Sequence, residues 1–422
     1  MFTDLLGDTL FALRLASPLA HAGISLLIFL TGRRVWDART GFWAGAGYLL
    51  APGVGVSSMI MSTDPVMMLA WAGGLYALVR ALETRDLKWW VAVGVLVGIG
   101  MLAKYTMAVF FAGMLGYLLF SPSDRDWKAI GAVLLAAFVV ILPNLMWNMA
   151  NNFATITHVA GDADPGRGYL HPGKLAEFVG AQFGVIGPVF FLAIGLALVQ
   201  WRRWHGDATM RLMVWLTATP LVPIVVLSFL TRAQPNWAAP AYVAGSLVAA
   251  RWLVMADWKK GLRLQVWSGV VGSVLFWGYV GYYGLRADHF TRAYDPFKKM
   301  RIGGPFCELA FGAMSEEGAT VLLSDDRRRL SECMFLGGLG WDEIAVWNPD
   351  LVPENHHELV ATLRPGDDRL MLLATLHDPS AMVAAFDEAR AIDSGQFRTH
   401  KDRSFKFYLW AVKGFRGYPG QP

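Results

Sequence analysis

Two charged side chains lie at the ends of long apolar stretches, where an ionisable group is costly and is therefore a candidate for function. Asp64 lies in the segment STDP at 62–65, and Lys104 lies in the segment MLAKYT at 101–106. A carboxylate at such a boundary can act as a general acid or base, or hold a metal or a sugar. An ammonium group there is a point charge that suits a phosphate. The structural alternatives are an Asp64 N-cap followed by proline and a lysine that only extends to water.

Two further segments are rich in polar groups, 143–158 and 232–237. Amides and an imidazole could bind a sugar or an acceptor, and an arginine could bind a phosphate through two hydrogen bonds. Interface anchoring, helix capping and an ordinary loop arginine are the alternatives. The candidates for sugar or acceptor binding are Asn148, Asn152, His158, Gln234 and Asn236, and the second candidate for the donor phosphate is Arg232.

Known nucleotide and metal motifs are missing from the sequence. We find no Walker loop, dinucleotide fingerprint, zinc motif or nucleophile elbow. Asp162, Asp164 and His171 follow no recognised metal-ligand spacing, so we assign no metal and no cofactor, although a need for a divalent cation stays open. The sequence therefore shows no site for a nucleotide-linked sugar. A sugar donor used beside Asp64 and Lys104 must arrive in another form, and a lipid-linked donor is the simplest.

The composition indicates a membrane protein. Of 422 residues, 55% are hydrophobic and 17% are charged, whereas soluble domains carry about 25% charged residues. Residues 1–285 contain 20 Lys and Arg against 13 Asp and Glu, and residues 286–422 contain 17 against 20. We therefore predict a basic, polytopic membrane domain over 1–285 and a soluble α/β domain over 286–422. No basic face with base-reading chemistry is visible, so we expect no nucleic-acid partner.

We predict about ten transmembrane helices from apolar stretches near the length needed to cross a bilayer. Those at 89–103 and 105–120 are short, and are either tilted or broken around Lys104. Loops on one side hold fifteen Lys and Arg, against four on the other side, which places the second set outside the cytoplasm. The predicted spans are 13–31, 41–61, 65–82, 89–103, 105–120, 127–148, 176–200, 212–230, 237–255 and 265–285.

Residues 286–422, which we call the tail, have shorter apolar runs than the membrane domain. Strands are expected at 319–324, 370–374 and 405–412, and helices near 327–336 and 379–390. Cys307 and Cys333 are the only cysteines. On an oxidising side of the membrane they are candidates for a disulfide, and two unpaired buried thiols are the alternative.

The order of these segments resembles the bacterial GT-C glycosyltransferases of the protein O-mannosyltransferase and lipid A aminoarabinose transferase type. The matching pieces are 11–15, 62–65, 100–106, 143–153 and 232–242, with 325–334 and 356–359 in the tail. The resemblance implies inverting transfer of a sugar from a polyprenyl phosphate to an envelope acceptor, which is lipid A or lipopolysaccharide, a glycan or a protein. It implies a multi-pass protein of the bacterial inner membrane with a periplasmic tail. Asp64 matches the family's acidic residue beside the active centre, and Lys104 matches its lysine near the donor phosphate.

The sequence departs from the family at its start. Relative to that family it lacks one N-terminal span and a large first outer loop bearing an acidic pair that supplies the presumed base. Either the start is misassigned or the chain is a degenerate member. The alternative functions are therefore a transporter or lipid flippase, and a non-catalytic scaffold for envelope assembly. A transporter is disfavoured because no internal repeat is visible.

Overall fold

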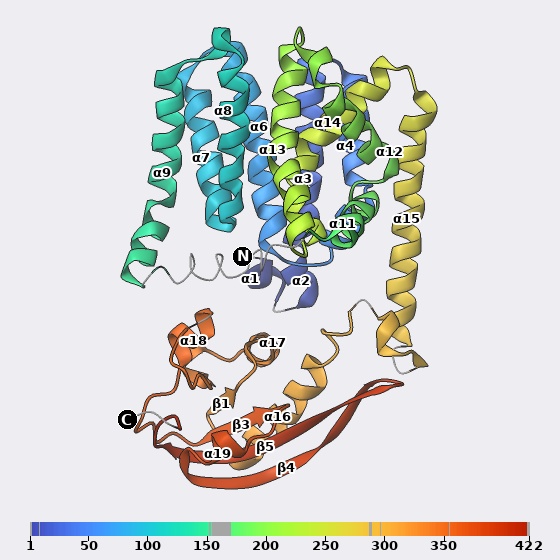
Figure 1. The fold of residues 1–422 in the computed structure, drawn as a ribbon. Coiled ribbons are helices and arrows are strands. Elements are labelled where there is room, and N and C mark those ends of the chain that lie inside the picture. The colour runs from blue at the N-terminus through green and yellow to red at the C-terminus, as the bar shows by residue number, and fades with distance from the viewer. Residues whose placement is uncertain are drawn as a thin grey trace. The chain divides into compact units, whose positions relative to one another are not determined.

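The protein consists of two compact units. The computed structural model describes residues 2–7, 9–151, 153, 170–286, 289–295, 297–353 and 355–419. The helical unit ends at Phe276, and the tail unit runs from Trp277 to the C-terminal residues (Figure 1). The expected fold class is confirmed, because apolar helices dominate the chain and a small α/β domain follows them. The boundary between the two units falls, in the sequence, within α15 (Lys259–Leu285).

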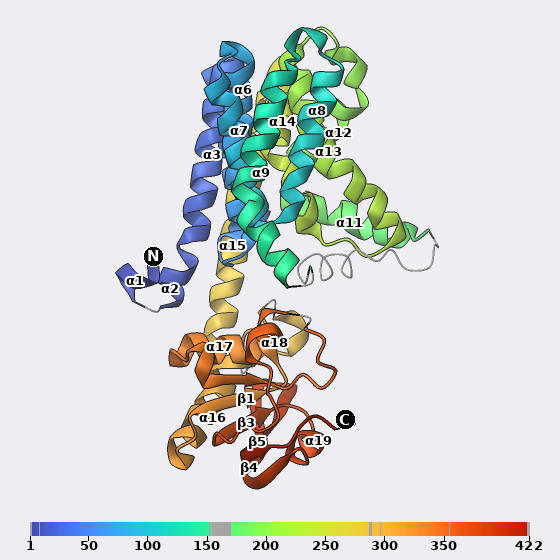
Figure 2. The same cartoon turned by 90° about the vertical axis from the view of Figure 1, so that its left-hand side faces the viewer.

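The helical unit is built from apolar helices, most of which are joined by short connections (Figures 1 and 2). Helix α6 is central: it packs against α3 and α7, and α7 packs against α9. Trp71 of α6 is fully buried, with its ring edge-to-face on Phe110 at a centroid distance of 5.1 Å. The elements are α1 (Phe2–Leu6), α2 (Leu10–Arg14), α3 (Ala16–Val35), α4 (Ala38–Leu49), α5 (Pro52–Ser57), α6 (Thr63–Thr84), α7 (Leu87–Ala103), η1 (Tyr105–Ala108), α8 (Val109–Leu119), η2 (Pro122–Asp124), α9 (Trp127–Ala150), α11 (Pro172–Val185), α12 (Pro188–Val199), η3 (Trp201–Trp204), α13 (Ala208–Leu230), η4 (Pro235–Ala238), α14 (Ala241–Met255) and α15 (Lys259–Leu285).

The ten predicted spans all fall on helices, but they are not ten straight rods. Among the described residues, five helical stretches are long and apolar enough to cross a membrane, namely Leu10–Val35, α6, α9, α13 and α15. The predicted span 176–200 is instead the pair α11 and α12, bent by 118°. The predicted span 41–61 is divided between α4 and α5. Helices α7 and α14 and the stretch Tyr105–Leu119 are apolar but shorter.

Each interruption has a local chemical cause. Pro52 and Pro188 stand at the first turn of α5 and α12, where a proline begins a helix but cannot continue one. Gly187 has a φ of 91° at the bend between α11 and α12, a conformation that favours glycine. Lys104 leaves helical geometry with φ −160° and ψ 124°, so the alternative of a break between α7 and α8 is the correct one.

A buried glutamine satisfies the backbone groups that the sharpest bend exposes. Gln265 of α15 is 1% exposed; it donates to the carbonyl of Ile186 at 2.7 Å and accepts from the amide of Phe190 at 3.1 Å. Backbone polar groups in an apolar bundle need such partners, because water is not available to replace them. The bend between α11 and α12 is therefore a fixed feature of the helical unit.

The tail unit contains a five-stranded sheet with the order β2-β1-β3-β5-β4. Strands β2, β1 and β3 are parallel, while β5 is antiparallel to both β3 and β4. Leu322 and Leu372 pack in one hydrophobic cluster, and Leu323 and Leu373 in another, so the parallel strands are buried on both faces. The elements are α16 (Gly303–Glu317), β1 (Val321–Ser324), α17 (Arg327–Gly337), β2 (Ile344–Val346), α18 (His356–Ala361), β3 (Met371–Thr375), α19 (Ser380–Val383), β4 (Phe386–His400) and β5 (Arg403–Phe415).

The three expected strands and the helix near 327–336 are present, but the helix expected at 379–390 is mostly wrong. Only α19 is helical there, and the chain continues from Phe386 as the long strand β4. The alanine-rich sequence favours a helix locally. Pairing with β5 over its whole length overrides that preference, because non-local pairing can outweigh propensities worth less than about 1 kcal/mol per residue.

A disulfide joins the two helices on one face of this sheet. Cys307 of α16 and Cys333 of α17 are bonded, with a Cα–Cα distance of 5.3 Å. Both residues are at most 1% exposed and lie in the cluster that contains Leu322 and Leu372. The bond therefore fixes α17, the helix that follows β1.

Asp295 is the polar centre at the start of the tail unit. Its side chain is fully buried, ion-paired with Arg301 and 2.9 Å from Nε2 of His400, and it accepts from the amide of Phe297 at 2.8 Å. Burial opposes ionisation of this carboxyl, but the bonds from Arg301, His400 and Phe297 outweigh it and hold its pKa below the usual value. Asp295 thus ties the segment after α15 to the end of β4.

We predict that the link through Asp295 weakens in acid. Since the folded-state pKa is lowered, its contribution to stability is complete above the ordinary pKa of about 3.9 and is lost as the pH falls through the folded-state value. Asp295→Ala should cost about 3 kcal/mol, because it leaves the buried partner groups without an acceptor. Hydrogen exchange of 289–295 and 399–403 in the full chain measures both effects. Equal protection in Asp295→Ala and in Asp368→Ala, whose carboxylate is 78% exposed, would contradict this prediction.

The disulfide gives a second stability prediction. Because the bond closes a loop between residues 26 apart, its removal in the double variant Cys307→Ala and Cys333→Ala should lower the free energy of unfolding of the tail unit by about 3 kcal/mol. Denaturant unfolding of the full chain, followed by hydrogen exchange in α16 and α17, measures the loss. Two free thiols found by mass spectrometry of the non-reduced protein would show that the pairing is wrong.

Candidate active site

The carboxylate of Asp64 lies in the first turn of α6. Ser62 is the N-cap residue of this helix, so the interpretation of Asp64 as the N-cap is wrong. The side chain of Asp64 is 15% exposed, and both of its oxygens accept hydrogen bonds from other elements. This half-buried carboxylate is the point at which three segments of the helical unit meet.

Lys104 provides the first of these bonds. Its ammonium Nζ lies 2.6 Å from Oδ1 of Asp64, and its side chain is 30% exposed. The interruption of helical structure between α7 and η1 directs Lys104 away from the axis of α7 and toward the first turn of α6. An ammonium group has three N–H donors, and Asp64 takes one of them.

Asn236 provides the second bond. Its Nδ2 donates to Oδ2 of Asp64 at 2.8 Å. The short helix η4 that carries Asn236 is held by Gln182, whose Nε2 donates to the carbonyl of Pro235 at 3.3 Å. Gln182 is itself fully buried and accepts from the hydroxyl of Tyr242 at 2.6 Å. The amide of Asn236 is therefore positioned from both α11 and α14.

A second polar cluster braces the residue after Lys104. The hydroxyl of Tyr105 donates to Oδ1 of Asn144 at 2.5 Å and accepts from Nδ2 of Asn148 at 3.1 Å. Asn148 is completely buried. It therefore positions the break beside Lys104 and presents no exposed group to a sugar, and its direct binding role stays a prediction.

Asp64 and Asn236 line one end of a cavity of about 450 Å³. Most of its wall is apolar and comes from α5, α6, α11 and α14. Helix breaks supply much of it: Gly53 and Val54 follow the break after α4, and Val185 and Ile186 precede the bend before α12. The cavity thus combines a long apolar wall with a polar end formed by Asp64, Asn236 and Ser62. We call it the Asp64 cavity.

His21, Tyr48 and Ser57 form a polar group in the wall that sequence reasoning missed as part of a site. Nδ1 of His21 lies 2.9 Å from the hydroxyl of Tyr48, and Nε2 lies 2.9 Å from Oγ of Ser57. These two contacts satisfy the imidazole of His21, which also lines the cavity. The signal for these residues, and for Gln182, is a lone polar side chain within an otherwise apolar helix.

The other candidates are not brought to this site. Arg232 is exposed and pairs with Glu177 at 3.1 Å. Neither Arg232 nor Lys104 lines the Asp64 cavity, but Lys104 bonds Asp64, which does, so the phosphate-binding role of Arg232 stays a prediction. Gln234 is exposed at the start of η4 and is not part of the cavity wall. Asn152 and His158 lie outside the described residues. Within the described ranges, no group of three His, Cys, Asp or Glu side chains could hold a metal ion.

Comparison with known proteins finds similar sequences. The family model for dolichyl-phosphate-mannose-protein mannosyltransferases (PMT_2) matches residues 1–147. The lipid A galacturonosyltransferase RgtD of Rhizobium johnstonii is 33% identical over 65% of this chain and 58% of its own length. The undecaprenyl phosphate-alpha-4-amino-4-deoxy-L-arabinose arabinosyl transferase of Pseudomonas aeruginosa is 26% identical over 59% of this chain and 47% of its own. The chain thus spans about half the length of these curated relatives.

A solved structure shows the same fold. The crystal structure of ArnT from Cupriavidus metallidurans bound to undecaprenyl phosphate superposes with a TM-score of 0.62 at 14% identity, and covers 97% of this chain and 85% of that chain. The structure of the same protein in the apo state gives a TM-score of 0.59. The order of the sequence segments, the two sequence relatives and the shared fold agree: the chain has the fold of a GT-C membrane protein and is similar in sequence to membrane glycosyltransferases.

Proposed function

We propose that this protein transfers a sugar from a polyprenyl-phosphate donor to an envelope glycolipid of the lipid A or lipopolysaccharide class. The observation that carries the proposal is the Asp64 cavity, because the carboxylate of Asp64 lies at the polar end of a largely apolar wall and is ion-paired, from behind the wall, with the ammonium of Lys104. A donor with an isoprenoid chain and a charged head group needs an apolar surface for the chain and polar groups for the head. The names of the relatives support the same substrate classes.

The apolar wall would hold the first isoprene units of the donor, and the polar end would hold its phosphate. Ligand sites of this kind are mostly apolar, with a few placed polar groups that fix orientation. Lys104 has two N–H donors beyond the one that bonds Asp64, and it can direct them to a phosphate oxygen. The Asp64 partner keeps the ammonium in place before the donor arrives.

In the transfer step, the acceptor hydroxyl oxygen attacks the anomeric carbon as the bond from that carbon to the phosphate oxygen breaks. The electron pair of the broken bond leaves with the polyprenyl phosphate. Lys104 stabilises the negative charge that develops there, as a cation already held in place by Asp64. Asp64 accepts the hydroxyl proton as general base, and Asn236 holds its other oxygen in place.

The distribution of basic loops supports an orientation with Asp64 and Lys104 on the outer side of the bacterial inner membrane. The tail unit would then lie in the periplasm. A disulfide between Cys307 and Cys333 is consistent with that compartment, because oxidising compartments are where structural disulfides persist. Labelling of an introduced cysteine at position 64 from the cytoplasmic side alone would contradict this orientation.

We predict that Asp64→Asn and Lys104→Ala each abolish most of the transfer. Loss of a general base costs about 10²- to 10⁴-fold, and loss of a cation at the leaving group costs about 10²- to 10³-fold. The assay uses detergent-purified full chain, lipid A, and polyprenyl phosphate carrying galacturonic acid, the sugar named for the relative with 33% identity. Product formation is followed by mass spectrometry of the lipid.

Matched controls come from the opposite end of the same helix. Glu83 of α6 pairs with Arg34 at 2.5 Å, so Glu83→Gln and Arg34→Ala remove the same charges without touching the cavity. These two variants should keep their activity. Full activity of Asp64→Asn and Lys104→Ala would remove the assignment, and solute flux in proteoliposomes without any sugar transfer would favour a transporter.

A second prediction concerns the apolar wall. Gly184 lies on α11 in the cavity wall, and a side chain built there meets open space, with nothing within 4 Å of its Cβ. Gly184→Leu should therefore place an isobutyl group in the cavity and weaken binding of undecaprenyl phosphate at least about tenfold, since one displaced isoprene contact is worth about 1.4 kcal/mol.

Gly180 is the control for this variant. It lies one turn earlier on α11, is also free of neighbours at Cβ, and does not line the cavity. Gly180→Leu should bind undecaprenyl phosphate as the parent protein does. Equal binding by Gly184→Leu and Gly180→Leu, measured by microscale thermophoresis, would place the lipid elsewhere.

A further inference from the structure

The tail unit has a cavity of its own at the carboxyl ends of its parallel strands. It measures about 470 Å³. The strand β1 ends at Ser324 and leads into α17, and β3 ends at Thr375. The carboxyl edge of parallel strands is where α/β folds place ligands. The cavity is lined by Lys299, Ile302, Asp326, Arg327, Arg328, Arg329, Leu376, His377, Arg403 and Phe405, and we call it the tail cavity.

Cations gather around the tail cavity although the tail is acidic. Five of its ten lining residues are Lys or Arg and one is Asp, whereas residues 286–422 hold 17 Lys and Arg against 20 Asp and Glu. Another cavity of the same unit, about 500 Å³, is lined by Glu308, Glu316 and Asp393 with apolar residues, and has no cation in its wall. The positive lining is therefore local and does not follow from composition.

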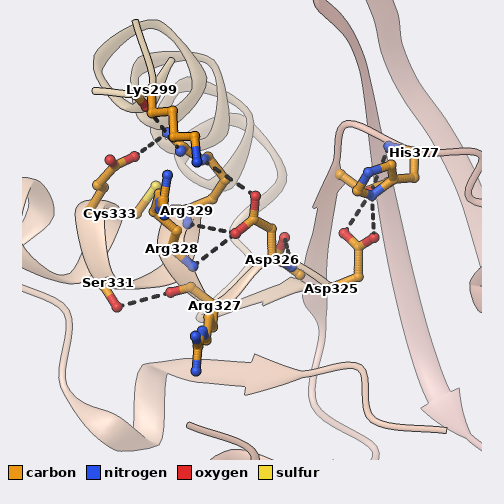
Figure 3. Close-up of polar contacts among 12 residues, drawn as sticks. Lys299, Asp325, Asp326, Arg327, Arg328, Arg329, Ser331, Cys333 and His377 are labelled. Carbon is orange, nitrogen blue, oxygen red and sulfur yellow. Dashed lines mark hydrogen bonds and ion pairs between the residues drawn. The ribbon is translucent and has the colours of Figure 1, made fainter. Parts of the chain in front are cut away.

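Carboxylates neutralise only part of this charge. Arg329 is ion-paired with Glu332, and its Nε lies 3.5 Å from Asp326 (Figure 3). His377 lies 2.6 Å from Asp325, whose other oxygen accepts from the hydroxyl of Thr375 at 2.7 Å. Among the described residues, no carboxylate pairs with the side chains of Lys299, Arg327, Arg328 or Arg403.

One buried N–H donor in the cavity wall, on Nε of Arg329, also lacks a hydrogen-bond acceptor among the described residues. The side chain of Arg329 is 3% exposed. Buried polar groups are normally satisfied, so an exception calls for an explanation such as a bound ion. The Asp326 side chain already accepts from the amides of Arg328 and Arg329, so an anion here would be held by side chains and not by the helix terminus.

We propose that the tail cavity is a binding site for a phosphate monoester. Four cations without a carboxylate partner among the described residues, a buried guanidinium donor and the imidazole of His377 surround one space, and Arg groups match the geometry of a phosphate. The group binds by charge-assisted hydrogen bonds, and no bond is made or broken. The phosphate is carried either by a lipid head group or by a soluble ion. The proposal stands whether or not the helical unit transfers a sugar.

The first test uses inorganic phosphate. Full-length protein in phosphatidylcholine nanodiscs, in a phosphate-free buffer, is titrated with phosphate or with chloride at equal ionic strength. We expect phosphate to slow hydrogen exchange at 325–332 and 375–378 with a dissociation constant of about 1 mM, and chloride to have no effect. Absence of protection at about ten times that concentration, together with the result of the lipid test below, would overturn the proposal.

A matched pair of variants distinguishes binding in the tail cavity from nonspecific electrostatic attraction of phosphate to the protein. Arg328→Gln should weaken phosphate binding about tenfold, the loss of one charge-assisted bond. Arg416→Gln removes the same charge from an exposed pair with Asp387 outside the cavity, and should bind phosphate unchanged. Both arginines are exposed, so both variants should fold. Equal weakening by the two substitutions would mean that only net charge matters and would overturn the site.

The source of the phosphate is distinguished by lipid composition. Nanodiscs containing phosphatidic acid, which carries a phosphate monoester, are compared with pure phosphatidylcholine discs in the absence of free phosphate. Protection that appears with phosphatidic acid and is lost in Arg328→Gln supports a lipid-borne group. Protection by free phosphate alone supports a soluble one. Protection by neither probe excludes a phosphate site in the tail cavity.

Discussion

A carboxylate and an ammonium that neutralise each other hold the polar end of the helical unit together. Asp64 at the start of α6 receives Lys104 from the break after α7 and Asn236 from η4, so residues 172 positions apart meet at one carboxylate. Neither charge could remain alone at the end of apolar helices without a large desolvation cost. The contact that lets these helices end side by side is therefore the same contact that sets the geometry of the candidate active site.

The Asp64 cavity exists because the helices around it are interrupted. An unbroken bundle would close the space, whereas here α5, the end of α11 and η4 each begin or end at the cavity wall. Interrupted helices in an apolar setting expose backbone groups that must find partners. Gln265 satisfies those at the bend between α11 and α12, and Gln182 satisfies the carbonyl of Pro235. Two buried glutamines thus make an irregular, ligand-sized space compatible with a membrane bundle.

The parts of this architecture that depend on local pattern could be predicted. Long apolar runs located the main helices of the helical unit, and short apolar runs located β1, β3 and β5, whereas α16 and α18 were not predicted. The bend at Gly187 and the strand β4 were missed because both depend on distant partners: Gln265 lies 75 residues from the amide of Phe190, and β4 exists only through β5. The wrong helix at 379–390 shows that a favourable local propensity says little when a long antiparallel partner is available.

The candidate active site was likewise predictable only where the signal was local. Asp64 and Lys104 could be singled out because a charge in an apolar stretch is conspicuous. Asn236 could be suggested only as one amide among several, and Asn148 and Arg232 looked equivalent to it in the sequence. Their separation came from three-dimensional facts, namely the complete burial of Asn148 and the pairing of Arg232 with Glu177. No spacing rule could have revealed that His21, Tyr48 and Ser57 share a wall.

The two cationic sites of this chain differ in how their charge is balanced before any ligand arrives. Lys104 is already paired, so a phosphate that binds it must share the ammonium with Asp64, and the free energy gained on binding is reduced by that competition. This suits a step in which the phosphate must later leave as part of the product lipid. The four cations of the tail cavity without a carboxylate partner among the described residues repel one another instead, and an anion relieves that repulsion on binding. An anion in the tail cavity displaces no carboxylate of the described residues from these four cations, whereas a phosphate at Lys104 competes with Asp64.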